Sequence, residues 1–312
     1  MGTVAISGCI AETRGSVDRR YRSAFAVAGI TVEITGDTPQ FVELGPQLLP
    51  FRTESKTCDI EVEVAWRPQL DPCHGRELFH SGCLWSAHKF ADDLAFDFTT
   101  ERLGPQPYKR LLVDWDFRNA KVVLNRQCLQ EGDAGRALEY PLDELLVTHH
   151  LSLGRGVELH GCGLVTQGGE SFLFVGHSGA GKSTTARLWR RYSPVEVLSD
   201  DRIIVRRNAS MSGTFLMHGT PWHGEAAFAL AASAPLDRVF LLEHGTGNRI
   251  ERVSRGAAAS ELLARSFTPF YQARFVEPVL ALLEELAESV PCYRFQFVPD
   301  ESAVEKILGF RD

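Results

Sequence analysis

The sequence predicts a two-domain protein: a mostly antiparallel β domain of α+β type over residues 1–145, followed by an α/β domain over residues 146–312. Three observations lead to this fold class. Segments with β-strand patterns dominate the first half, strand and helix patterns alternate in the second half, and a glycine-rich segment joins an apolar strand to a helix there.

The β character of the first domain comes from four segments rich in β-branched and aromatic residues. They are TVEITG (31–36), IEVEVAW (60–66), RLLVDWDF (110–117) and AKVVLNR (120–126). Glycine, proline and aspartate lie between the segments, as turns require. The stretch Asp116–Ala120 predicts a hairpin turn between the last two.

The second domain opens with a helix that begins near Tyr140–Asp143 and ends at Gly154 or Gly156. Strand patterns follow at 157–167, 171–176, 195–200, 202–207, 215–219, 238–244 and 292–298. Helical patterns lie at 182–192, 257–267, 275–289 and 302–310. Strands that alternate with helices are typical of an α/β domain.

Composition narrows the classes of function. A net charge of −7 argues against broad nucleic-acid binding, which needs concentrated basic residues. We see no run of 18 apolar residues, so no membrane span is expected. The N-terminus has no basic start before a long apolar run, which argues against a signal peptide. Together these features predict a cytoplasmic protein.

Seven scattered cysteines without a CxxC pair favour reduced thiols in the cytosol over disulfides. One stretch gathers residues that can bind metals, and they are Cys73, His74, His80, Cys83 and His88. Their spacing matches no structural zinc pattern. The sequence therefore favours ordinary loop and strand residues here over a metal site.

The strongest motif is GHSGAGKS at 176–183, which fits the P-loop pattern GxxxxGK[ST] at every fixed position. An apolar strand enters it and a helix leaves it, so backbone amides and the helix N-terminus can surround phosphate oxygens. Lys182 supplies a positive charge and Ser183 a hydroxyl for Mg²⁺. The residues expected to bind the nucleotide are Gly176, His177, Ser178, Gly179, Ala180, Gly181, Lys182, Ser183 and Thr184. A plain glycine-rich turn is the alternative.

A second acidic motif follows in VEVLSDD (195–201), a mostly apolar strand that ends in two aspartates. This is a Walker-B-like element, which brings a carboxylate close to the phosphates and Mg²⁺. The pair can divide the work: Asp200 would hold the ion while Asp201 accepts a proton from the attacking group. The alternative is a polar cap at a strand-to-turn junction.

At these residues the sequence resembles the C-terminal catalytic domain of HPr kinase/phosphorylase, as a divergent relative with a fold shared with phosphoenolpyruvate carboxykinase. The resemblance covers about residues 155–207. It rests on His160-Gly161, the segment 176–183, and LSDDR at 198–202. It implies that Asp200 lies at the metal, that Asp201 is the general base, and that His160 assists proton movement beside it. A core-packing role is the alternative for His160.

The sequence departs from this family in two ways. The glycine- and arginine-bearing signature that follows the nucleotide site in HPr kinases is not recognisable, and the first domain shows no resemblance, so HPr itself is not the expected acceptor. Instead, the loop HGTPWHGE (218–225) follows a strand and could reach the nucleotide or acceptor; Trp222 as a core cap is the alternative. The arginines considered for charge stabilisation are Arg249, Arg252, Arg255 and Arg265.

The leading hypothesis is an Mg-ATP-dependent kinase that transfers the γ-phosphoryl group to a hydroxyl of a protein, peptide or small molecule, with Lys182, Asp201 and His160 as catalytic residues and GTP as an alternative nucleotide. The first domain would recognise the acceptor. An NTPase or carboxykinase-like enzyme, or a nucleotide-binding regulatory or assembly protein without transfer chemistry, is the alternative. No nucleic acid or membrane partner is expected, and apolar helix faces near the C-terminus permit a homo-oligomer.

Overall fold

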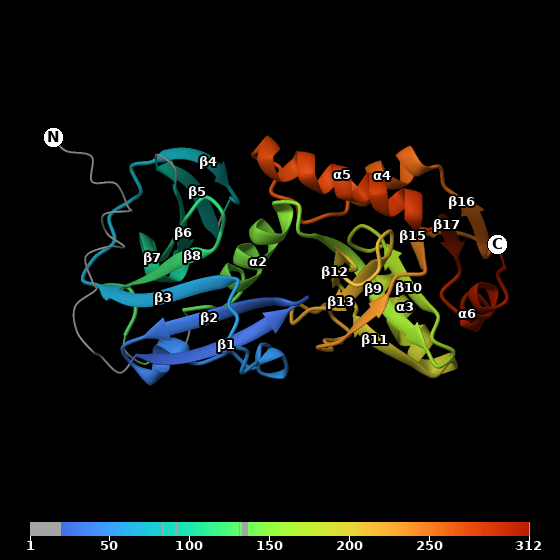
Figure 1. The fold of residues 1–312 in the computed structure, drawn as a ribbon, viewed down its shortest axis with the longest axis horizontal. Coiled ribbons are helices and arrows are strands. Elements are labelled where there is room, and N and C mark those ends of the chain that lie inside the picture. The colour runs from blue at the N-terminus through green and yellow to red at the C-terminus, as the bar shows by residue number, and fades with distance from the viewer. Residues whose placement is uncertain (1–19, 83, 91–92, 131, 133–136, 312) are drawn as a thin grey trace. The chain divides into compact units, whose positions relative to one another are not determined.

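The computed structural model describes residues 20–82, 84–90, 93–130, 132 and 137–311 (Figure 1). The chain divides into two compact units between Leu146 and Val147. None of the helices in these described ranges is both long and apolar enough to cross a membrane.

The described part of the first unit is built on one eight-stranded sheet in the order β1-β2-β3-β8-β7-β6-β5-β4. Its strands are β1 (Tyr21–Val27), β2 (Ile30–Gly36), β3 (Ile60–Arg67), β4 (Arg76–His80), β5 (Trp85–Phe90), β6 (Asp93–Thr100), β7 (Gly104–Val113) and β8 (Asn119–Asn125). Short 3₁₀ helices are η1 (Pro39–Val42), η2 (Leu49–Phe51) and η3 (Glu101–Leu103). The helix α2 (Leu142–Ser152) runs across the division between the units.

A nine-stranded sheet forms the second unit, in the order β14-β13-β12-β9-β10-β15-β17-β16, with β11 paired to β9 beside this path. Its strands are β9 (Val157–Thr166), β10 (Ser171–Val175), β11 (Val195–Ser199), β12 (Arg202–Arg207), β13 (Phe215–Gly219), β14 (Ser233–Pro235), β15 (Arg238–His244), β16 (Arg249–Arg252) and β17 (Cys292–Phe297). The helices are α3 (Lys182–Tyr192), α4 (Arg255–Leu263), α5 (Ala273–Ser289) and α6 (Glu301–Leu308).

The predicted fold class is wrong. The protein is mostly β, with 39% of residues in strands and 24% in helices, and it has two large mixed sheets rather than an α/β P-loop domain plus a separate, mostly antiparallel β domain. In the first sheet, β3 pairs in parallel with both β2 and β8. In the second sheet, only the pairs β10–β15 and β15–β17 are parallel, and β9, β12, β13 and β14 connect to their neighbours as antiparallel strands.

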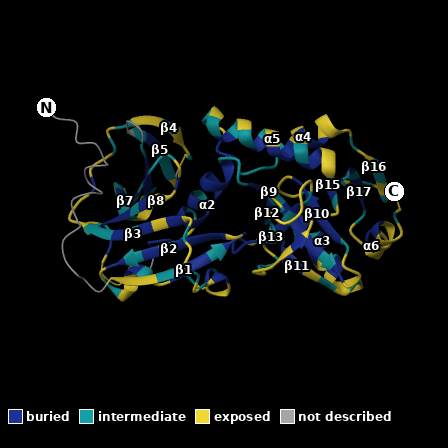
Figure 2. Ribbon diagram, in the orientation of Figure 1, coloured by how far each residue is buried: buried dark blue, intermediate teal, exposed yellow. Residues whose placement is uncertain are grey.

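Alternation along the central strands of the second sheet produces two apolar layers. On β10, Leu173 and Val175 pack with α4 and α5, whereas Phe172 and Phe174 pack with α3 and α6. Successive strand residues point to opposite faces, so one short apolar strand supplies both layers. All five residues of β10 are therefore buried, as its dark colour in Figure 2 shows. This buried strand leads directly into the glycine-rich segment.

The turn between β7 and β8 lies two residues earlier than the sequence predicted. β7 ends at Val113 and β8 begins at Asn119. The carboxylate of Asp114 accepts hydrogen bonds from the backbone N–H groups of Arg118 and Asn119, at 2.8 and 3.1 Å. An aspartate that holds its own turn in this way explains where the strand ends.

Candidate active site

The glycine-rich segment forms the connection between β10, which ends at Val175, and α3, which begins at Lys182. Gly181 has φ of +99°, in the left-handed region that side chains with a Cβ rarely adopt. A Cβ on Gly176 would lie 2.6 Å from the Cβ of Ala180. The tight loop therefore needs glycine at both positions, and it leads into the start of α3, where the first N–H groups of a helix have no carbonyl partner within the helix.

Lys182 is buried, with 5% of its surface exposed, although its side chain carries a charge. Its Nζ donates to the backbone carbonyls of Gly176 and His177, at 3.0 and 2.9 Å. Burial lowers the pKa of Lys182, and the nearby charges of Asp201 and Asp200 oppose this effect. The loop thus holds the ammonium group in place by its own carbonyl oxygens.

Asp200 is fully buried and accepts four hydrogen bonds, which matches the acceptor capacity of a carboxylate. Its Oδ2 accepts from the hydroxyl of Ser183 at 2.9 Å and from the N–H of Ala226 at 3.0 Å. Its Oδ1 accepts from the N–H groups of Gly224 and Phe228, at 3.1 and 3.2 Å. Asp200 therefore connects the start of α3 to the loop after β13.

Asp201 belongs to a second hydrogen-bonded group. Its Oδ1 lies 2.9 Å from Nε2 of His160 on β9, and its Oδ2 accepts from Nη1 of Arg202. Burial works to raise the pKa of the Asp201 carboxyl, but the His160 hydrogen bond and the charges of Arg202 and Lys182 outweigh it, so the pKa lies below its ordinary value. Asp201 is thus held in its ionised form.

The chain bends at the two aspartates but keeps the same register against β9 on both sides of the bend. Ser199 pairs with Gly163 and Arg202 pairs with His160, and between these pairs the N–H of Gly161 donates to the carbonyl of Asp201 at 2.9 Å. Asp200 is fully buried, whereas Asp201 is partly buried and lines the hollow.

These elements surround a hollow of about 360 Å³ at the start of α3. Its lining residues are His160, Ser178, Gly179, Gly181, Lys182, Ser183, Thr184, Arg187, Asp201, Gly224 and Glu225. Most of the residues selected from the sequence thus meet in one place. Gly176, His177 and Ala180 belong to the loop but do not line the hollow, and Asp200 lies behind it.

Sequence reasoning missed one of the lining residues, Arg187, whereas Gly224 and Glu225 belong to the loop HGTPWHGE that it had singled out. Arg187 lies four residues after Ser183 on α3, one helical turn onward, and this spacing could have revealed it. Gly224 and Glu225 come from the loop HGTPWHGE, whose contact with Asp200 no local pattern predicts. In the same loop, Trp222 is buried and His218 lies on β13, away from the lining of the hollow.

The four arginines considered from the sequence are not among the residues that line the hollow. Arg249 and Arg265 pair with glutamates close to them in sequence, Glu251 and Glu261. Arg255 pairs with Glu288 on α5, and Arg252 donates to the hydroxyl of Tyr293. Among the described residues, Arg187 and Lys182 are the cationic side chains that line it.

No family model matches this chain. A comparison with curated proteins finds no significant match either.

Proposed function

We propose that the hollow binds a nucleoside triphosphate with Mg²⁺ and that the protein is a phosphotransferase acting on a hydroxyl group. The observation that carries the proposal is the pair Asp200 and Asp201: one carboxylate is bound to the P-loop serine, and its neighbour faces the hollow beside His160. Asp200 would thus lie near the metal ion, and Asp201 would be the carboxylate that accepts a proton. The resemblance to HPr kinase/phosphorylase over residues 155–207 supports the same division of roles.

The phosphates would lie over the loop 176–181 and the first turn of α3. The first N–H groups of a helix are hydrogen-bond donors that favour anions, and the helix dipole adds to this preference. Lys182 and Arg187, which both line the hollow, would add positive charge next to the phosphate chain.

The oxygen donors at the helix start fit Mg²⁺, which prefers hard oxygen ligands and keeps several waters. Ser183 would be the direct ligand, because its hydroxyl is already oriented by Asp200. Asp200 would lie outside the direct ligands of Mg²⁺, since all four of its acceptor sites are used by protein donors. When bound, Mg²⁺ supplies neutralisation of charge on the phosphate oxygens.

Asp201 would accept the proton of the acceptor hydroxyl while the oxygen of that hydroxyl forms a bond to the γ-phosphorus. The bond from that phosphorus to the bridging oxygen breaks, and the nucleoside diphosphate leaves. His160, bound to the other side of Asp201, would orient the carboxylate and share the proton afterwards. Positioning and charge neutralisation would supply most of the rate.

One observation favours a second candidate, a nucleotide-binding regulator without transfer chemistry. Both oxygens of Asp201 already have a partner, His160 and Arg202. If these bonds persist when nucleotide binds, Asp201 would be a structural anchor and not a base.

Two measurements test the proposal. Binding of Mg-ATP and Mg-GTP is measured by calorimetry on the wild type and on Lys182→Ala, with the exposed Lys306→Ala as the matched control. A charged hydrogen bond to phosphate contributes about 1.5–3 kcal/mol, so its loss weakens binding roughly 10- to 150-fold. We expect this loss in Lys182→Ala and not in Lys306→Ala. Equal binding by all three proteins would refute the nucleotide site.

Transfer is then measured with γ-labelled ATP and a protein and small-molecule extract of the source cell. We expect Asp201→Asn to bind nucleotide but to lose transfer by at least about 100-fold, as removal of a general base does, while the exposed Glu305→Gln keeps full transfer. Nucleotide binding without any transfer in the wild type would favour the regulator. Transfer that survives Asp201→Asn would remove Asp201 from the role of base.

A further inference from the structure

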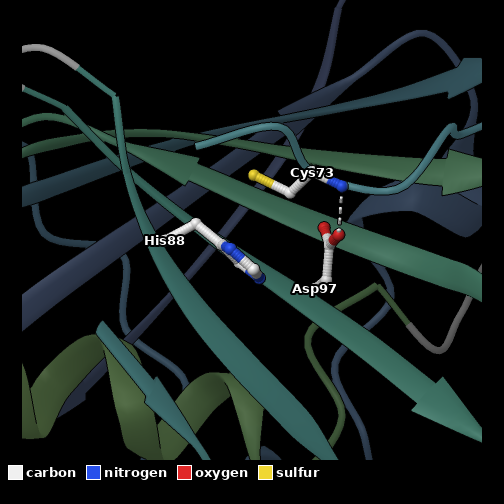
Figure 3. Close-up of side chains that lie close together, drawn as sticks. All are labelled: Cys73, His88 and Asp97. Carbon is white, nitrogen blue, oxygen red and sulfur yellow. Dashed lines mark hydrogen bonds between the residues drawn. The ribbon is translucent and has the colours of Figure 1, made fainter. Parts of the chain in front are cut away.

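Three side chains that can bind a metal come together in the first unit, far along the chain from the P-loop. Cys73 lies on the loop before β4, His88 on β5 and Asp97 on β6. The thiol sulfur, a ring nitrogen and a carboxylate oxygen all lie within 4.8 Å of one another. Figure 3 shows the three side chains coming from these separate segments toward one small region.

The sheet register brings the strand residues together. Ser86 pairs with Asp97, and Asp97 pairs with Arg110 on β7. Because side chains alternate along a strand, His88 shares a face with Ser86, two residues away. Ser86, His88, Asp97 and Arg110 therefore lie on one face of three neighbouring strands, and the loop that holds Cys73 passes over it.

His88 is 9% exposed, and its two ring nitrogens differ in their surroundings. Nε2 lies 2.9 Å from the hydroxyl oxygen of Ser86, whereas Nδ1 is buried and has no hydrogen-bond partner among the described residues. The tautomer that donates from Nε2 to Ser86 leaves a bare lone pair on Nδ1. A histidine whose second nitrogen is held by a hydrogen bond is the usual arrangement of a metal ligand.

Asp97 is 4% exposed and is oriented in a similar way. Arg110 donates to both of its oxygens, with Nη2 at 2.8 Å from Oδ2, and the N–H of Cys73 donates to Oδ2 at 3.3 Å. A carboxylate has about four acceptor positions, so Oδ1 keeps one. Hydrogen bonds that fix a carboxylate from behind are also found around bound metals.

We propose that Cys73, His88 and Asp97 form a Zn²⁺ site with three protein ligands and a fourth position open to solvent. The thiolate and imidazole favour zinc over Mg²⁺ or Ca²⁺, which prefer oxygen ligands. Zinc bonds of about 2.0–2.3 Å place tetrahedral ligand atoms about 3.5 Å apart, so closure on the ion needs side-chain shifts of about 1 Å. Cys73 and Arg110 also line a hollow of about 360 Å³, which supplies the open side.

This set differs from the one that the sequence suggested. His74 and His80 are not part of it, and Cys83 lies outside the described residues. Asp97 was not considered, because it is nine or more residues beyond the cysteines and histidines and joins them only through strand pairing. The site is independent of the proposed phosphotransferase site.

The test uses the full chain after removal of metals with a chelator. Zn²⁺ is titrated by calorimetry in excess Mg²⁺, which occupies oxygen sites such as that at Ser183. We expect one equivalent to bind, and about 100-fold weaker binding or none in Cys73→Ser. Cys128→Ser, which removes another partly buried thiol of the same unit, is the matched control and should bind as the wild type.

Co²⁺ reports directly on the ligand set, because a thiolate bound to it adds a charge-transfer absorption. We expect this band in the wild type and in Cys128→Ser but not in Cys73→Ser. Ser86→Ala keeps all three ligands and removes only the support of the His88 ring, so it should bind Zn²⁺ about 10- to 100-fold more weakly. This variant tests the site even where Cys73→Ser fails to fold.

Three outcomes would overturn the proposal: no stoichiometric Zn²⁺ binding by the wild type, no thiolate band with Co²⁺, or equal affinity in the wild type and Ser86→Ala. The first two would leave a Cys–His–Asp cluster without a metal, in which the backbone N–H of Cys73 bonds to Asp97 and His88 bonds to Ser86. Unchanged Zn²⁺ binding in Lys182→Ala would separate this site from the P-loop.

Discussion

Replacement of Asp200 by asparagine should destabilise the second unit and loosen one loop at a defined residue. Asparagine has almost the same shape as aspartate but accepts hydrogen bonds through only one atom. With its oxygen at the Oδ1 position, it still accepts from Gly224 and Phe228. Its NH₂ group then faces the N–H of Ala226, which is left without an acceptor, while the Ser183 hydroxyl can turn and accept instead.

The magnitude follows from the number of donors left without a partner. One buried backbone N–H without an acceptor costs about 1–3 kcal/mol, and Ala226 is partly buried, so Asp200→Asn should lower the free energy of unfolding by up to that amount. Asp200→Ala removes the acceptor of three backbone N–H groups and one hydroxyl, and should cost upward of about 3 kcal/mol. The same 1–3 kcal/mol predicts roughly 5- to 140-fold faster amide exchange at Ala226.

Urea denaturation and hydrogen exchange measure these two quantities. Asp201→Asn is the control for charge, because it removes the same charge one residue away and leaves the Ala226 bond intact. We expect faster exchange at Ala226 than at Gly224 or Phe228 in Asp200→Asn only. The assignment of Asp200 as the residue that holds this loop would be refuted if the free energy of unfolding of Asp200→Asn lay within about 0.5 kcal/mol of the wild-type value and exchange at Ala226 were unchanged.

Three further predictions concern the same unit. Gly224→Ala should weaken nucleotide binding measured by calorimetry, since its Cβ would lie 2.8 Å from Oδ2 of Asp200, whereas Gly256→Ala, which meets no atom within 4 Å, should not. The stability that Asp201 contributes is present above its ordinary pKa of 3.8 and is lost as pH falls through its lowered folded-state pKa. The difference in free energy of unfolding between the wild type and Asp201→Asn, measured by urea denaturation, should therefore disappear in that acidic range. Burial, with a smaller effect of Arg206, lowers the pKa of His218 from 6.5 to about 4. As pH falls between these values, the unfolded chain takes up a proton first, so the free energy of unfolding should decrease, and it should decrease less in His218→Gln. An equal decrease with pH in the wild type and His218→Gln, measured by urea denaturation, would exclude this.

The strand, glycine-rich loop and helix of residues 171–192 could be predicted from the sequence because their geometry is local. The order of apolar strand, glycine-rich loop and helix is written in residues 171–192, and the structure has β10, the loop and α3 there. His160 and Asp201 are 41 positions apart, and they meet because Arg202 pairs with His160 across two strands. Single-sequence patterns do not specify such a pairing; the family resemblance suggested it.

The sheets could not be predicted in the same way. A strand pattern such as IEVEVAW indicates which face is buried, but the direction of its neighbours depends on residues far away. β3 thus has parallel neighbours on both sides, although the first domain was expected to be mostly antiparallel. The bonds of Asp200 to residues 224–228, and the meeting of Cys73 with His88 and Asp97, are long-range contacts of the same kind.

The position of the aspartate pair also limits how this chain can vary in length. β11 and β12 pair with the two halves of the same strand, β9, and only Asp200 and Asp201 connect them. An insertion or deletion of one residue at this point would shift β11 or β12 against β9 and displace the two carboxylates. Relatives that keep this site should therefore show no gaps between residues 195 and 207, while the turn at 208–214, between β12 and β13, can change in length freely.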